Sequence, residues 1–96
     1  MSVVQYRNET LEARLARATD EQIQDALRAA VRETTPSGRV CAYFELAPAG
    51  KFRPSSVARM LDVSPSTVRR VCRTHFGMKP EKYLGNGWWF HRGGRS

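Results

Sequence analysis

The 96-residue chain has few cysteines and no long hydrophobic run. Small secreted domains usually carry several disulfides, whereas this chain has only Cys41 and Cys72, so buried thiols are expected instead. A run of about eighteen apolar residues, as a membrane span requires, does not occur. The first residues also lack the apolar stretch of a secretory signal. We therefore expect a cytoplasmic, single-domain protein with no membrane partner and a modest core.

The chain also lacks the residue patterns of common catalytic and metal sites. It has no glycine-rich phosphate loop, no paired carboxylates and no arrangement of a nucleophile with a base. Cys72 and His75 are spaced like two zinc ligands, but no second tight pair exists and Cys72 belongs to an apolar stripe. We expect neither enzymatic activity nor a metal or other cofactor.

Acidic residues are scarce in the last two-thirds of the chain. Residues 37–96 contain eleven basic and three acidic residues, whereas residues 1–36 contain five basic and six acidic ones. No acidic residue occurs between Val63 and Pro80. The net charge of +7 is therefore concentrated in one part of the chain, which indicates a surface that faces a polyanion.

The N-terminal third predicts two amphipathic helices. Apolar residues recur at a helical spacing over about residues 9–18. Thr19 and Gln22 then have the spacing of a capping box, which predicts the start of a second helix that ends near Glu33. We interpret residues 1–36 as a candidate dimerisation element, with completion of the monomer's core as the alternative.

The following segment contains one ambiguous and one clear helical pattern. The apolar residues around Val40 and Phe44 fit either a short strand or a helix from about Gly38 to Leu46. Pro54 then suits the first turn of another helix. Its buried side is expected to consist of Val57, Ala58 and Leu61.

A further helix is expected over Ser64–Phe76. Ser64 and Pro65 combine an N-cap residue with proline at the first helical position, and Gly77 suits the C-terminal cap. One half of the helical wheel is apolar, and the other half has no acidic residue. That half carries Ser66, Arg69, Arg70 and Arg73. Because the guanidinium fork matches the edge of guanine, this half predicts contact with DNA bases.

The two helices are joined as a helix-turn-helix requires. Ala58 is small where the helices would cross, and Asp62 stands at a turn position where glycine is common but where aspartate tolerates left-handed geometry. The second helix would enter the major groove with its N-terminus first, which brings Ser64, Ser66 and Thr67 nearest to the DNA. The candidate phosphate contacts, which set affinity rather than sequence preference, are Ser64, Arg53, Arg59 and Lys79.

The end of the chain combines aromatic and basic residues. A short helix is expected after Pro80, and residues 85–96 are expected to form a tail. Its aromatic cluster, Trp88–Phe90, is expected to fold onto the core or support an interface rather than stack on bases. The basic end fits either a DNA-contacting arm or a solvated terminus.

Two stretches resemble the DNA-binding region of AraC-type transcription regulators. These are residues 57–70 and, more specifically, residues 75–84 with the sequence His-Phe-Gly-Met-Lys-Pro-Glu-Lys-Tyr-Leu. The resemblance covers somewhat less than half of the chain and extends weakly to Val40–Leu46, which favours a helix there. It implies transcriptional control, with base recognition by Ser66, Thr67, Arg69, Arg70 and Arg73.

The chain departs from that family in two respects. AraC-type regulators carry two such motifs in tandem beside an effector domain, whereas this chain has one motif and no effector domain, so we expect no small-molecule effector. One motif offers little surface for tight specific binding. A homodimer that reads half-sites about one helical turn apart is therefore expected.

Together these patterns predict an all-α domain that binds double-stranded DNA. The expected function is that of a sequence-specific transcription regulator, repressor-like and of bacterial or phage type. Two alternatives remain. One is an architectural or accessory factor for recombination, replication or partition, and the other is a small inhibitor that binds an acidic protein partner.

Overall fold

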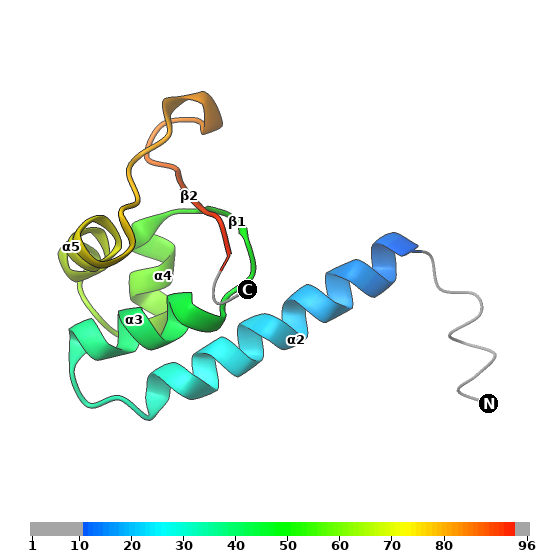
Figure 1. The fold of residues 1–96 in the computed structure, drawn as a ribbon, viewed down its shortest axis with the longest axis horizontal. Coiled ribbons are helices and arrows are strands. Elements are labelled where there is room, and N and C mark those ends of the chain that lie inside the picture. The colour runs from blue at the N-terminus through cyan, green and yellow to red at the C-terminus, as the bar shows by residue number, and fades with distance from the viewer. Residues whose placement is uncertain (1–10, 94–96) are drawn as a thin grey trace.

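The computed structural model describes residues 11–93, with side chains from residue 18 onward. This part of the chain is mostly helical and includes a small two-stranded antiparallel sheet (Figure 1). The elements in chain order are α2 (Leu11–Val31), α3 (Pro36–Leu46), β1 (Gly50–Phe52), α4 (Pro54–Leu61), α5 (Pro65–Phe76), the 3-10 helix η1 (Lys82–Leu84) and β2 (Trp89–His91).

The N-terminal helix α2 runs without a break through the position where two helices were expected. The predicted boundary at Thr19 is therefore wrong. Residues 11–31 contain neither glycine nor proline, so no helix-breaking residue ends the helix before Thr19. Each further residue then extends the helix by one hydrogen bond. Gln22 does not act as part of a cap, because its side-chain amide donates to the carbonyl of Leu46 at 3.0 Å.

α3 forms the centre of the fold and packs against both α2 and α5. The expected helix over residues 38–46 is confirmed, but it begins two residues earlier because Pro36 occupies its first turn and the Thr35 hydroxyl accepts from the backbone N–H of Gly38. Phe44 of α3 is almost completely buried. Its ring contacts aromatic rings from four other positions, namely Tyr43, Phe52, Phe76 and His91.

The sheet was not predicted from the sequence. β1 and β2 pair antiparallel with Phe52 opposite Trp89, and a single bridge joins Pro80 to Trp89 on the other side. The region expected to be a tail, residues 85–96, therefore contains a strand, and its Trp89 is only 2% exposed. The expectation that the aromatic cluster folds onto the core is met by Trp89, which belongs to the main hydrophobic cluster.

These contacts place α4, α5 and the segment 80–91 together on one side of α3. We call residues 80–91 the hairpin segment, since its two arms are joined by the Pro80–Trp89 bridge and by a hydrogen bond from the Glu81 N–H to the Trp88 carbonyl. In Figure 1 the hairpin segment projects from the body near α5. None of the helices in residues 11–93 has the length and hydrophobicity needed to cross a bilayer.

Candidate nucleic-acid interface

A tight left-handed turn joins α4 to α5. Asp62 has φ 57° and ψ 49°, and its backbone N–H and that of Val63 are both directed to the carbonyl of Ala58. Asp62 is the non-glycine residue with positive φ in the described chain, which confirms the left-handed geometry expected for it. Ala58 is buried between the helices, where a larger side chain would separate them.

The first turn of α5 is capped by its own side chains. The Ser64 hydroxyl accepts from the backbone N–H of Thr67 at 3.2 Å, and the two hydroxyl oxygens lie 2.9 Å apart. Pro65 takes the first helical position and Gly77 ends the helix with φ 67°. The predicted start and end of this helix are therefore confirmed. Ser66 is also exposed, and unlike Ser64 and Thr67 its side chain makes no hydrogen bond to another described residue.

The two sides of α5 differ as the helical wheel predicted. Val68, Val71 and Cys72 are buried against α3 and α4. The opposite side exposes Arg69, Arg70 and Arg73 to solvent. The structure thus places three predicted base-contacting arginines on one exposed face.

These arginines are held to different degrees. A terminal nitrogen of Arg70 donates to the Ser37 hydroxyl of α3 at 3.2 Å. The guanidinium of Arg73 lies over the ring of Trp89, 5.6 Å from its centroid. Arg69 has neither a hydrogen bond nor an ion pair with another described residue. Of the three, Arg69 is therefore the arginine with neither a hydrogen bond nor an aromatic contact to another described residue.

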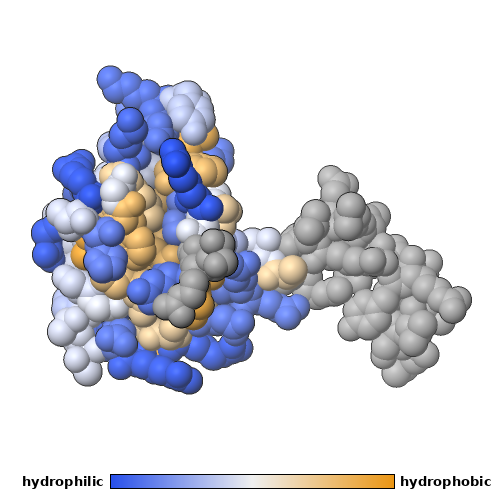
Figure 2. Space-filling model, viewed as in Figure 1, coloured by the Kyte–Doolittle hydropathy of each residue, from blue (hydrophilic) through white to orange (hydrophobic). Residues whose placement is uncertain are grey.

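The positive charge of this region is not neutralised within the protein. Across residues 18–93, the side-chain ion pair that forms joins Arg28 to Asp25 within α2. The basic side chains of residues 37–93 make no ion pair with a described carboxylate. Figure 2 shows hydrophilic side chains around the outer edge of the visible face and hydrophobic ones near its centre. The uncompensated charge therefore remains available to an external anion.

The remaining predicted residues lie around this face. Arg53 is the N-cap residue of α4, and its guanidinium lies over the Trp88 ring at 4.8 Å. Arg59 is exposed in the last turn of α4, and Lys79 is exposed beyond the end of α5. Neither Arg59 nor Lys79 contacts the arginines of α5, so these residues share exposure with that face but are not joined to it.

Lys51 also belongs to this surface, although the sequence did not indicate it. Its Nζ atom lies 4.7 Å from the centroid of the Trp88 ring, on which Arg53 also packs. The only available signal was the high density of basic residues after residue 37. Nothing in the local sequence of Lys51 indicates that β1 pairs with a strand close to the end of the chain.

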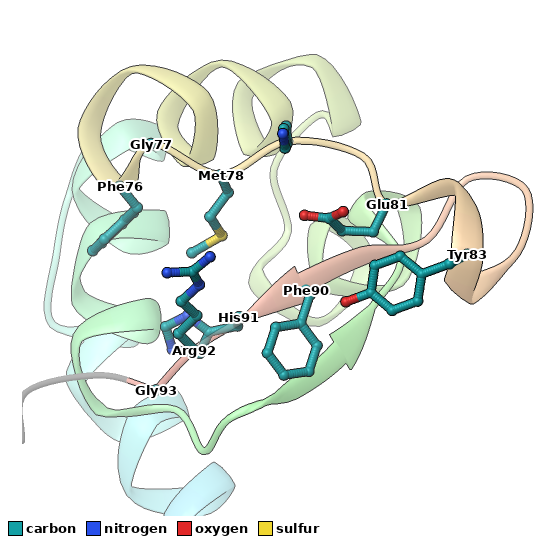
Figure 3. Close-up of a pocket in the computed structure, with 10 residues that line it drawn as sticks. Phe76, Gly77, Met78, Glu81, Tyr83, Phe90, His91, Arg92 and Gly93 are labelled. Carbon is teal, nitrogen blue, oxygen red and sulfur yellow. The ribbon is translucent and has the colours of Figure 1, made fainter.

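A cavity of about 490 Å³ lies beside the hairpin segment. Figure 3 shows the Tyr83 and Phe90 rings near each other and the Met78 side chain extending toward Arg92. Glu81 and Arg92 bring opposite charges to its lining. In the described part of the chain, no group of three His, Cys, Asp or Glu side chains is arranged to hold a metal ion.

The buried titratable groups support packing rather than chemistry. Burial raises the pKa of the Cys72 thiol to about 12, and burial with two nearby carboxylates raises the pKa of Cys41. Burial also lowers the pKa of His91, although the nearby backbone of Ala47 and Phe44 acts in the opposite direction. Both thiols are therefore protonated and His91 is neutral near pH 7.

Comparisons of the chain with protein-family models, with curated proteins and with solved structures gave no match.

Proposed function

We propose that this chain is a sequence-specific DNA-binding transcription regulator, repressor-like in action, that inserts α5 into the major groove. In this proposal α4, the turn at Asp62 and α5 form a helix-turn-helix, with α5 as the recognition helix. The resemblance of residues 57–84 to the DNA-binding region of AraC-type regulators supports the same assignment.

The observation that carries the proposal is the uncompensated row of arginines on α5. Residues three or four apart on a helix are neighbours, so Arg69, Arg70 and Arg73 repel one another in the free protein. No acidic side chain of the described residues relieves that repulsion. Phosphate groups and guanine edges would relieve it, and an arginine fork binds both in a bidentate manner.

The structure allows different roles for these side chains. Arg69 and Ser66 are free and exposed, which suits direct contact with base edges. Arg70 and Arg73 are already oriented by Ser37 and Trp89, which reduces the conformational entropy lost on binding. The N-terminus of α5, with Ser64 and Thr67, suits a phosphate contact. The further phosphate contacts proposed are Arg53, Arg59 and Lys79.

We also propose that the chain binds DNA as a homodimer. A single recognition helix buries too little surface for tight specific binding, and a two-fold dimer supplies a second one. Figure 1 shows the first part of α2 extending beyond the rest of the fold, which leaves this segment of helix for a second copy. Sedimentation equilibrium at micromolar concentration should give twice the monomer mass.

Selection of binding sites from a random duplex pool tests this function. The wild type should enrich a short two-fold-related sequence. Arg69→Ala or Arg70→Ala should each cost about 1–3 kcal/mol of discrimination at one base position, whereas Lys79→Ala should weaken all sequences alike. Arg32→Ala is the matched control, because Arg32 is exposed just after α2 and belongs to neither helix of the proposed motif.

The outcomes separate the proposed function from its alternatives. A bounded, palindromic footprint on the selected sequence supports a regulator. An extended array of protected sites without a preferred sequence would indicate an architectural factor instead. If no duplex is enriched and neither arginine variant changes the result, α5 is not a recognition helix and an acidic protein partner becomes the better explanation.

A further inference from the structure

The outward face of the two-stranded sheet holds two cations on a single aromatic ring. The Lys51 Nζ atom and the Arg53 guanidinium lie 4.7 and 4.8 Å from the centroid of Trp88. Both side chains are exposed and neither forms an ion pair with a described carboxylate. A cation over a ring face is stabilised without being neutralised. The two positive charges are therefore held together and remain fully available to an anion.

The geometry of the hairpin segment fixes the position of that ring. Side chains alternate along a strand, and Trp89 and His91 of β2 are buried in the core. Trp88, just before the strand, instead contacts the exposed Lys51 and Arg53. Gly85, at φ 116°, lies against the ring, and a Cβ atom there would be 3.0 Å from Trp88 Cδ1. A hydrogen bond of 2.9 Å from the Glu81 N–H to the Trp88 carbonyl fixes the backbone of Trp88 to the other arm of the hairpin segment.

This cluster is continuous with the arginine face of α5. Trp88 contacts Arg53 at the start of α4, and the adjacent Trp89 contacts Arg73 of α5. Trp88, just before β2, and Trp89, its first residue, thus contact cations from β1, from the start of α4 and from α5. In Figure 1 the hairpin segment follows α5 in the chain and rises from the body of the fold, and the Arg73–Trp89 contact joins its base to α5.

The surroundings of Arg53 match the oxygen atoms of a phosphodiester. Arg53 is the N-cap residue of α4 but its side chain makes no capping hydrogen bond. The exposed hydroxyls of Ser55 and Ser56 follow in the first turn of that helix. A ring-stacked guanidinium still presents its N–H edge outward, and together these donors suit an anion with several oxygens.

We propose that Lys51 and Arg53, positioned by Trp88, form a second contact with the phosphate backbone of the same duplex that α5 reads. This proposal rests on the proposed function and deepens it. Lys51 is a binding residue that the sequence did not indicate, and Trp88 is a positioning residue that acts through the two cations. The DNA backbone that borders the groove occupied by α5 then lies across the outward face of the sheet.

The test measures the affinity of the full chain for one duplex over a series of NaCl concentrations. Lys51→Gln should reduce the slope of log affinity against log salt by about 0.9, the value expected for one phosphate contact. Trp88→Leu should weaken binding several-fold although it removes no charge. Trp88→Phe keeps a ring under the cations and should restore most of the loss. Arg32→Gln removes the same charge elsewhere and should leave affinity and slope near those of the wild type.

The outcomes distinguish this proposal from the proposed function. If the wild type binds and Arg69→Ala weakens binding, but Lys51→Gln leaves both slope and affinity unchanged, the second contact is wrong and the function of α5 stands. If the wild type binds no duplex, both are wrong. If near-ultraviolet circular dichroism shows that Trp88→Leu is unfolded, the result for the exposed Lys51→Gln variant alone decides whether the second contact exists.

Discussion

α2 and α5 both expose arginines, but they differ in what surrounds those arginines. In α2, Arg28 forms an ion pair with Asp25 one turn earlier. In α5, the arginines have a hydroxyl, an aromatic ring or solvent as their neighbours and no carboxylate. Exposure of an arginine therefore does not by itself indicate what the side chain binds. A group of arginines without a carboxylate partner inside the protein is the better indication of an external anion.

The largest expected effect comes from reversing the charge of α5. Arg69→Glu combined with Arg73→Glu should reduce affinity for duplex DNA by at least about 100-fold, because two favourable contacts become repulsive. The same change at the end of α2, Arg28→Glu within the helix and Arg32→Glu just after it, should alter affinity far less. Fluorescence anisotropy with one labelled duplex measures both. Equal losses in the two variants would remove the distinction between the helices.

A single substitution should give α5 the balanced charge of α2. In Ser66→Glu, the new carboxylate lies three and four residues before Arg69 and Arg70. Affinity for DNA should fall by about 10-fold, while the free energy of unfolding should rise by about 0.3–1 kcal/mol because an acid in the first helical turn is favourable. Ser66→Gln, which adds the same bulk without charge, should do neither. A variant that lost stability together with affinity would contradict this account.

The helices and caps of residues 54–77 could be predicted because their signals are local. Pro54, Ser64 and Gly77 each act within a few residues of their own position, and Asp62 adopts the expected left-handed turn. The same logic failed at Thr19, where a start signal occurs inside a segment that has nothing to end the preceding helix. A capping box predicts the start of a helix only where a residue that ends the preceding helix comes before it.

The hairpin segment and its contribution to the candidate site could not be predicted in this way. β1 and β2 have three residues each, too few to show a period of two, and they pair across almost forty positions of sequence. That pairing is what brings Lys51 to Trp88. The arginines of α5 were found because they share one helix face, whereas Lys51 is placed only by tertiary structure.

A smaller effect is expected on stability at acid pH, and its cause is His91 in the hairpin segment rather than a residue of α2. His91 of β2 is 4% exposed, its Nε2 atom has no hydrogen-bond partner, and burial lowers its pKa from the ordinary 6.5. As the pH falls through 6.5 the unfolded chain therefore binds a proton before the folded chain does. The free energy of unfolding should decrease over that range.

Urea unfolding at several pH values measures this decrease. His91→Gln supplies the control, because it removes the titrating group and should flatten the dependence below pH 6.5. The exposed His75 is retained in both proteins. A wild-type curve parallel to that of the variant would show that His91 is not responsible.

The smallest effect is expected in α2 itself. Arg28→Ala removes the ion pair with Asp25, but both side chains are about two-thirds exposed, at 68% and 65%. An exposed pair of this spacing contributes only about 0.3–0.5 kcal/mol. Thermal unfolding should therefore shift slightly, and the affinity for DNA should not change. A loss of affinity here would extend the DNA-binding surface to α2.

The most direct test of the central claim is the dependence of binding on salt. The purified protein is titrated against a short duplex of random sequence at several NaCl concentrations. Submicromolar affinity at low salt, with a log–log slope of about −2.7 to −4.5, is the expected result for about three to five neutralised phosphates. Absent binding, or binding that salt does not weaken, would mean that the uncompensated arginines of α5 serve a different partner.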